Sequence, residues 1–179
     1  MSSTAVENKI TRSQAYGIIS AYLDVLTDRN INFEICGSWR RGKTEIGDLD
    51  FVITDCAISK LLDVVGDVFP SAVHRSGGSL LSLKVLCYGK EIQVEFITVP
   101  KESFGSARLH ATGNAQFNIA MRTYCKNKGF DKLNQYGLFK DGHIIASETE
   151  EDVFSALGLK VIPAENRADF WKIYKNYKF

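Results

Sequence analysis

The sequence lacks the features that mark several classes of protein. No run of about 18 apolar residues occurs in it, so nothing predicts a membrane span. The first ten residues, MSSTAVENKI, lack the apolar stretch of a secretory signal. The four cysteines are scattered without a CxxC motif, and the three histidines form no pair at metal-ligand spacing. These absences argue against a zinc site or a disulfide framework. They predict an intracellular, reducing compartment without separating cytoplasm from nucleus.

An excess of one charge is also missing, since 22 Lys and Arg stand against 21 Asp and Glu. The distribution is uneven, because residues 1–100 carry 10 Lys or Arg and 12 Asp or Glu, and residues 101–179 carry 12 and 9. An acidic front half and a basic back half suit a metal site beside a phosphate-binding surface. Ordinary fluctuation between halves explains the counts equally well, so charge alone leaves the function open.

Helical and extended patterns alternate along the chain. Thr11 and Gln14 have the form of a capping box at a helix start. The apolar spacing predicts helices over residues 12–28, 58–69, 114–128, 150–157 and 168–179. Strands are expected over residues 31–35, 48–54, 80–88, 91–99, 136–140 and 143–146, the last two as a hairpin about Asp141-Gly142. With Pro100 as a boundary, the sequence predicts an α+β protein of two units, residues 1–100 and 101–179.

The most informative segment is residues 37–54, GSWRRGKTEIGDLDFVIT. Asp48 and Asp50 are two apart on a predicted strand, so their side chains leave the same face. Close carboxylates repel one another, and two divalent ions about 3.5–4 Å apart would relieve that conflict and promote phosphoryl transfer. A bare DxD is common at strand ends and turns, so this pair alone is a weak sign of a metal site.

The residues before the pair strengthen the interpretation. Gly37-Ser38 ends one strand, and the turn or helix start after it offers free backbone amides to an anion. Arg41 follows, and its fork of donors suits a phosphate. Within fourteen residues the chain therefore has the parts of a phosphate and metal site. The alternative is a surface turn with solvated arginines.

The pattern GSxRRG followed by GDxD resembles the palm signature of the X-family DNA polymerases, the group that includes DNA polymerases beta and lambda. The resemblance implies a nucleotidyltransferase-type palm with a mixed sheet and flanking helices. It also implies that Gly37, Ser38 and Arg41 bind the incoming triphosphate. Asp48 and Asp50 would then hold two Mg²⁺ ions, for which Mn²⁺ can substitute.

The family needs a third carboxylate on a neighbouring strand, usually an aspartate in an apolar run before Pro-Lys. The stretch IQVEFITVPKESF has Glu95 at that place, which is a departure because glutamate is one methylene longer. Mg²⁺ demands near-ideal octahedral geometry, so either the backbone compensates or the chemistry is slow. Glu91 is the reserve candidate on the same face, and a solvated strand residue is the alternative for Glu95.

The stretch HATGNAQFNIAMRTYCKNKGF resembles the YFTG segment of the family and the helix after it. The resemblance implies a cis Gly113–Asn114 peptide at the nucleotide site. It implies that Asn118 contacts the nucleotide and that Arg122, one turn later, reaches the template strand. His110, with the alanine after it, replaces the usual aromatic pair and is the nucleotide-site residue there. A polar helix face is the alternative for Asn118 and Arg122.

The last third of the chain extends the resemblance. KLNQYGLFKDG resembles a hairpin of the family and is especially close to that of its reduced viral members, with Asn134 and Tyr136 as matching DNA-contacting residues. EEDVFSALGLKVIPAENR matches the C-terminal sequence of the family, so the resemblance covers roughly residues 9–167. It implies a small α+β, thumb-like C-terminal unit for nucleotide selection. We expect no lyase or helix-hairpin-helix domain.

The leading hypothesis from the sequence is a DNA-directed DNA polymerase with gapped or nicked DNA and dNTPs as partners, no membrane, and a monomeric state. The alternatives are a template-independent, RNA or small-molecule nucleotidyltransferase, and a catalytically weak DNA-end-binding protein in which Glu95 has disabled the metal site. Likeness to reduced viral enzymes is consistent with a viral source. In the tail, residues 168–179, aromatic and lysine residues each recur at every third position. An amphipathic helix packed on the body is favoured there over a DNA contact.

Overall fold

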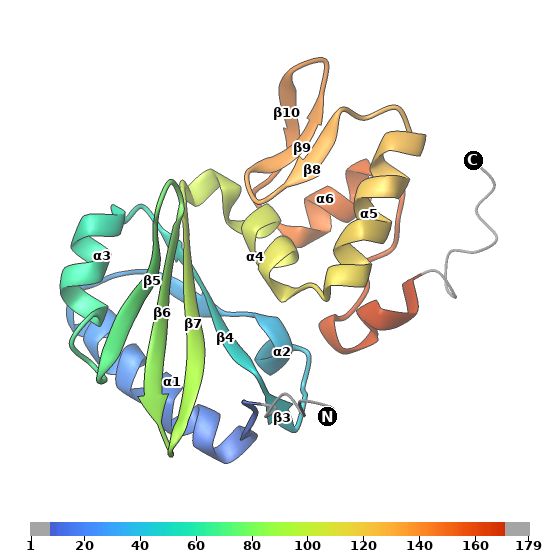
Figure 1. The fold of residues 1–179 in the computed structure, drawn as a ribbon. Coiled ribbons are helices and arrows are strands. Elements are labelled where there is room, and N and C mark those ends of the chain that lie inside the picture. The colour runs from blue at the N-terminus through green and yellow to red at the C-terminus, as the bar shows by residue number, and fades with distance from the viewer. Residues whose placement is uncertain (1–7, 171–179) are drawn as a thin grey trace, which may run out of the picture.

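The computed structural model describes residues 8–170, which form a five-stranded mixed sheet, a small three-stranded sheet, a two-stranded pair and several helices (Figure 1). The helices are α1 (Arg12–Asp28), α2 (Gly37–Arg40), α3 (Ile58–Val65), α4 (Phe104–Thr112), α5 (Ala115–Asn127) and α6 (Glu150–Ala156), with the 3₁₀ helices η1 (Lys101–Ser103) and η2 (Ala164–Asp169). The strands are β1 (Ile10–Thr11), β2 (Phe33–Ile35), β3 (Glu45–Ile46), β4 (Asp48–Thr54), β5 (Ser71–Gly77), β6 (Leu80–Cys87), β7 (Lys90–Val99), β8 (Lys132–Asn134), β9 (Gly137–Lys140) and β10 (His143–Ala146).

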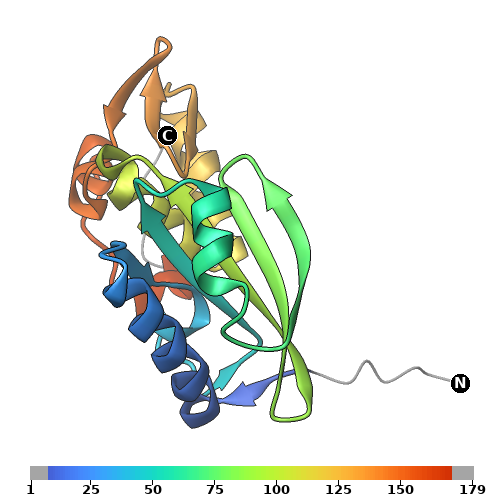
Figure 2. The same cartoon turned by 90° about the vertical axis from the view of Figure 1, so that its left-hand side faces the viewer.

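The large sheet has the strand order β2-β4-β7-β6-β5. Strands β4 and β7 pair in parallel and the other neighbours are antiparallel, which confirms the predicted mixed sheet. One face is apolar and packs on α1 and α3 (Figures 1 and 2). Because side chains alternate along a strand, the residues between these apolar positions face the other side. That second face carries the carboxylates of the candidate site.

Helix α1 explains why this core forms. The capping box of Thr11 and Gln14 is present as predicted, so the amides at the helix start have partners. The apolar stripe then buries Ile18, Tyr22 and Leu26 completely. Tyr22 meets the rings of Phe51 and Phe96 of the sheet edge-on, at centroid distances of 5.8 and 5.3 Å. Helix and sheet are thereby held together by aromatic packing.

The C-terminal half has a core of its own, built from α4, α5, α6 and the sheet β10-β9-β8 (Figure 1). The predicted turn at Asp141-Gly142 is confirmed, and both residues have positive φ, 51° and 78°. A small third cluster joins the halves, because Ala107 of α4 packs with Cys36, Val52 and Val99 of the large-sheet half. No helix among the described residues has the length and apolarity to cross a membrane.

Some elements differ from the sequence prediction. The helix predicted over residues 58–69 ends at Val65, since Gly66 is its C-cap. Strand β5 is exposed along its whole length and so shows no apolar alternation. Helix α4 buries small residues, among them Gly105, Ser106 and Ala107, and therefore lacks a visible apolar stripe. Strand β8 is only three residues long. The helix predicted over residues 168–179 lies almost wholly outside the described residues.

Gly105 tests the packing of α4 on the segment before α6. Its amide donates to Glu148 O at 3.0 Å, and a Cβ at this position would lie 2.2 Å from the carbonyl carbon of Thr149. Gly105→Ala should lower the free energy of unfolding by about 1–3 kcal/mol, because two backbones must separate. Urea unfolding provides the measurement. Gly47→Ala is the matched control, since among residues 8–170 its Cβ would meet nothing closer than Lys9 Cγ at 3.8 Å. Equal midpoints for both variants would refute the tight contact.

Candidate active site

The three predicted carboxylates lie on one face of the large sheet. Asp48 and Asp50 are two apart on β4, and the parallel register of β4 and β7 pairs Asp48 with Gln93 and Asp50 with Glu95. Paired residues of neighbouring strands project to the same side of a sheet. The side chains of these two pairs therefore lie together on one face, with Asp48 and Asp50 on β4 and Gln93 and Glu95 on β7. Asp48 is exposed, whereas Asp50 and Glu95 are half-buried. The sheet register therefore brings together the residues that the sequence singled out.

The electrostatics of this group are unfavourable as the chain stands. Burial, together with the negative charges of Asp48 and Glu95, raises the pKa of Asp50 to about 8, and Arg41 offsets the increase only in part. Hard divalent cations prefer oxygen ligands of this kind, so the donor set fits a metal in type and charge. Within residues 8–170, no three His, Cys, Asp or Glu side chains are yet close enough to hold an ion. One oxygen of Glu95 is engaged by Gln93 instead.

Gly37 brings helix α2 against the carboxylates. It has φ of +57°, and a Cβ there would lie 1.8 Å from Asp50 Oδ2, so only glycine fits. The Cys36 amide donates to Asp50 O at 2.8 Å and fixes the approach. Ser38 Oγ, the next polar atom of the turn, is buried without a hydrogen-bond partner in the described chain. A buried hydroxyl of this kind needs a partner, which fits a ligand with acceptor oxygens.

Arg41 connects this turn to the C-terminal half. Its Nη1 donates to Thr112 O at the end of α4. A Cβ at Gly113 would lie 3.6 Å from Arg41 Nη1 and 3.7 Å from Asn118 Nδ2. The Gly113–Asn114 peptide is cis, as the resemblance implies. Three predicted nucleotide-site residues from the two halves, Arg41, Gly113 and Asn118, thus meet at one place.

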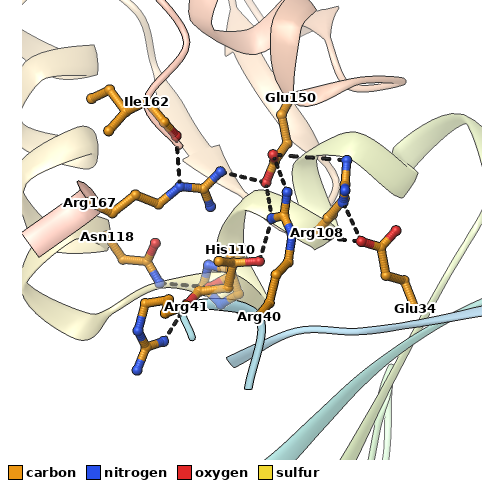
Figure 3. A network of polar contacts seen from close by, with 10 residues as sticks. Glu34, Arg40, Arg41, Arg108, His110, Asn118, Glu150, Ile162 and Arg167 are labelled. Carbon is orange, nitrogen blue, oxygen red and sulfur yellow. Dashed lines mark hydrogen bonds and ion pairs between the residues drawn. The ribbon is translucent and has the colours of Figure 1, made fainter. Parts of the chain in front are cut away.

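His110, Asn118 and Arg122 line one small cleft within the C-terminal half. Asn118 Nδ2 donates to His110 O at 2.8 Å, which orients its amide (Figure 3). Burial lowers the pKa of His110, and the charge of Arg122 lowers it further, so the imidazole is neutral at pH 7. Arg122 itself is exposed. The cleft therefore combines a neutral ring, an oriented amide and an accessible cation.

Asn134 is the last residue of β8, and Tyr136 lies in the turn that leads to β9. Asn134 Oδ1 accepts from the Tyr136 amide at 2.9 Å, and Tyr136 O accepts from Ser103 Oγ at 3.0 Å. The Tyr136 side chain packs against the cluster that joins the two halves. Both residues shape this turn and are half-buried, and their contact with DNA stays a prediction.

Sequence reasoning missed the polar network next to the site, which is centred on Glu150 (Figure 3). Glu150 is only 3% exposed, yet Arg40 donates to both of its oxygens, at 2.7 and 2.8 Å. Arg167 Nη2 lies 2.8 Å from the same carboxylate. On the other side, Glu34 accepts from Arg108 Nε at 2.7 Å. Glu150 follows the helix cap Thr149, so from the sequence it is typical of an exposed acidic residue at a helix start.

Two family models match the chain. The model described as the DNA polymerase beta palm matches residues 11–93, and the one described as the DNA polymerase beta thumb matches residues 107–168. The two matches lie on either side of the junction between the two halves of the structure.

Curated relatives agree with these matches. The chain is similar to the DNA polymerase/3'-5' exonuclease PolX of Bacillus subtilis, with 30% identity over 76% of this chain and 24% of the relative. It is similar to DNA polymerase lambda of Rattus norvegicus, with 31% identity over 69% of this chain and 26% of the relative. It is 29% identical to the repair DNA polymerase X of African swine fever virus over 71% of this chain and 76% of the viral protein. The chain thus spans about a quarter of the first two relatives and about three quarters of the viral one.

Glu150 gives a prediction about acid stability. Burial alone would raise the pKa of Glu150. The hydrogen bonds and positive charges of Arg40 and Arg167 outweigh that effect, so the pKa is lowered. A carboxyl whose folded pKa is depressed stabilises the fold above its unfolded pKa, and that stability is lost as pH falls through the folded value. Glu150→Gln should therefore cost about 3–5 kcal/mol at pH 7, because two arginines lose their counter-charge, and should cost less in acid. Urea titrations at pH 7 and pH 4 measure this.

The control for that experiment is Glu151→Gln, because the neighbouring carboxylate is exposed in the same first turn of α6. It should change the free energy of unfolding by less than about 0.5 kcal/mol. A cost of Glu150→Gln that is no larger than that of the control, or that does not shrink in acid, would contradict a buried ion pair.

Asp50 should behave in the opposite way. A carboxyl whose folded pKa is raised, here to about 8, favours the fold most below its unfolded pKa, and this stability is lost as pH rises toward the folded value. In EDTA, Asp50→Asn should therefore raise the thermal midpoint at pH 8 and change it little at pH 4. Added Mn²⁺ or Mg²⁺ should raise the midpoint of the native chain and leave that of the variant unchanged. A variant less stable than the native chain in EDTA at pH 8 would contradict the charge conflict.

Proposed function

Because the chain belongs to the X family of DNA polymerases, we propose that it is a DNA-directed DNA polymerase that adds a dNMP to a primer 3′-hydroxyl at short gaps or nicks. The name of the viral relative supports a role in DNA repair. The first two relatives are much longer than the matched region, so the activity of this chain is inferred from its own site.

The observation that carries the proposal is the contact of α2 with both parts of the site. At one end, Gly37 lies so close to Asp50 that no side chain fits between them. At the other end, Arg41 binds the Thr112 carbonyl and lies beside Gly113. A triphosphate on this turn would have carboxylates on one side and the C-terminal half on the other. This is the arrangement that phosphoryl transfer requires, because positioning and charge stabilisation supply most of the catalysis.

The family is metal-dependent, and we propose that Asp48, Asp50 and Glu95 bind two Mg²⁺ ions, with Mn²⁺ as a substitute. Bound Mg²⁺ supplies Lewis-acid activation of the attacking hydroxyl and stabilisation of the leaving oxygen. The chain itself supplies the oxygen ligands, and the half-buried setting of Asp50 and Glu95 strengthens their interaction with cations. The repulsion that raises the pKa of Asp50 supports this assignment, since cations would relieve it.

We propose that the incoming dNTP is held by both halves. Gly37, Ser38 and Arg41 would bind the triphosphate, and the buried Ser38 hydroxyl supports this because it lacks a partner in the described chain. Gly113, Asn118 and His110 would contact the sugar and base, which lets the C-terminal half select the nucleotide. We accordingly propose residues 1–100 as the catalytic palm and residues 101–179 as the nucleotide-selection unit.

We propose that DNA runs across the face that carries Arg122, Asn134 and Tyr136. The exposure of Arg122 supports a template contact, and binding that rests on a few such cations should weaken with salt. The proposal includes a monomeric enzyme. Template-independent, RNA and small-molecule nucleotidyltransferases are not favoured, since the relatives compared above are named as DNA polymerases.

Single-nucleotide incorporation on a one-nucleotide-gapped duplex tests this function. With Mg²⁺ or Mn²⁺, the chain should extend the primer by the templated dNTP in preference to the other three. Asp50→Ala should reduce the rate by about 10³-fold or more, since a lost metal contribution of several kcal/mol corresponds to that factor. The assay is a time course of labelled primer on a denaturing gel.

Two controls make that assay decisive. Omitting the template strand should abolish the extension, and equal extension without it would favour a template-independent enzyme. A native chain that binds the gapped duplex but extends no primer with either metal would overturn the polymerase proposal. It would support the DNA-end-binding alternative.

A further inference from the structure

Gln93 has a contact that none of the proposed roles uses. Its Nε2 donates to Glu95 Oε1 at 2.6 Å. The two residues are two apart on β7, so their side chains leave the same face of the sheet, and both are half-buried there. A hydrogen bond to an ionised carboxylate is stronger than one between neutral groups. The amide of Gln93 is thus bound to the one predicted metal ligand that departs from the family pattern.

The neighbouring strand offers a second donor to the same carboxylate. Ser82 of β6 pairs with Glu95 in the antiparallel register, so both side chains lie on one face. Ser82 is 1% exposed, and its hydroxyl is buried without a hydrogen-bond partner in the described part of the chain. An unpaired buried hydroxyl costs free energy, so a small rotation of Glu95 toward it would be favourable.

Glutamate needs such support more than aspartate does. Its longer side chain has an additional rotatable bond, so more conformational entropy is lost when the carboxylate is fixed beside Asp50. A hydrogen bond from a rigid neighbour restricts the Glu95 side chain before any metal binds, so less conformational entropy is lost on metal binding. Because the Gln93 bond engages Oε1, Oε2 can act as a monodentate ligand while the bond persists.

We propose that Gln93 is a positioning residue that orients Glu95 for metal binding, with the Ser82 hydroxyl as its second donor. The inference rests on the proposed function, because it assigns Glu95 as the third ligand. Donors that hold a metal ligand in place typically contribute about 10–100-fold in metal affinity or activity. Gln93 does this through its amide, so a side chain of equal length without a donor should lose the effect.

The experiment is a double-mutant cycle of Gln93→Met and Glu95→Asp in the full chain. Methionine keeps the length of glutamine and cannot donate, and aspartate at 95 is too short to keep the 2.6 Å contact. In the native background, Gln93→Met should weaken Mn²⁺ binding about 10-fold and lower kcat by a similar factor, with less change in the KM for dNTP. In the Glu95→Asp background, the same substitution should change both quantities less than about twofold.

Mn²⁺ binding is measured by the electron paramagnetic resonance signal of the free ion, so the result does not depend on turnover. Gln116→Met is the matched control, because it makes the same substitution at an exposed residue of α5 that has no proposed role in the site. It should leave Mn²⁺ affinity unchanged. Circular dichroism and thermal midpoints establish that each variant is folded, and Ser82→Ala provides a second, smaller perturbation of the same carboxylate.

The outcomes separate this inference from the proposed function. Equal effects of Gln93→Met in both backgrounds, or no effect on Mn²⁺ affinity in the native one, would overturn the positioning role even if the native chain is a polymerase. A native chain that binds Mn²⁺ and loses that affinity in Gln93→Met, but extends no primer, would retain the positioning role and reject the polymerase.

Discussion

The pairing of Arg40 with Glu150 is the interaction on which the arrangement of the site depends. The carboxylate comes from the start of α6 and the guanidinium from the end of α2, and both are largely withdrawn from water. Charges in such a place are tolerated only when they are paired, so separating the two residues is costly. The pair therefore holds helix α2 against the C-terminal half. Its neighbour Arg41 is then within reach of Thr112, and the two consecutive arginines act in different parts of the molecule.

Glu150 and Asp50 are both withdrawn from water, but they differ in where their counter-charge comes from. Glu150 has its partners within the chain, and its pKa is lowered despite burial. Asp50 faces two other carboxylates and has only the partial help of Arg41, and its pKa is raised. A proton or a bound cation would relieve this conflict, and the proposed function assigns that part to a cation. The contrast separates a carboxylate that is neutralised by arginines of its own chain from one that is surrounded by like charges.

The sequence predicted those parts of the molecule that are determined locally. The capping box of Thr11, the strand that carries Asp48 and Asp50, and the turn at Asp141-Gly142 each depend on a few adjacent residues, and all three are confirmed. Strand β5 and helix α4 were missed, because one has no buried side and the other buries small residues. The same limit applies to the site. Arg40 and Glu150 are 110 residues apart, and nothing in the surroundings of either indicates the partner.

The backbone and the side chain determine different properties of the third carboxylate, Glu95. The parallel register of β4 and β7 pairs residue 95 with Asp50, whatever side chain residue 95 has. A slip of one residue would turn every side chain of β7 to the opposite face, where the apolar core excludes a carboxylate. The backbone thus fixes the place, and only the reach and freedom of the side chain are left to vary. A longer carboxylate at a fixed place needs donors on the same face, and the alternation of β7 and β6 provides Gln93 and Ser82 there. A glutamate at the place where the resemblance expects an aspartate therefore affects the immediate neighbours of residue 95 and leaves the fold unchanged.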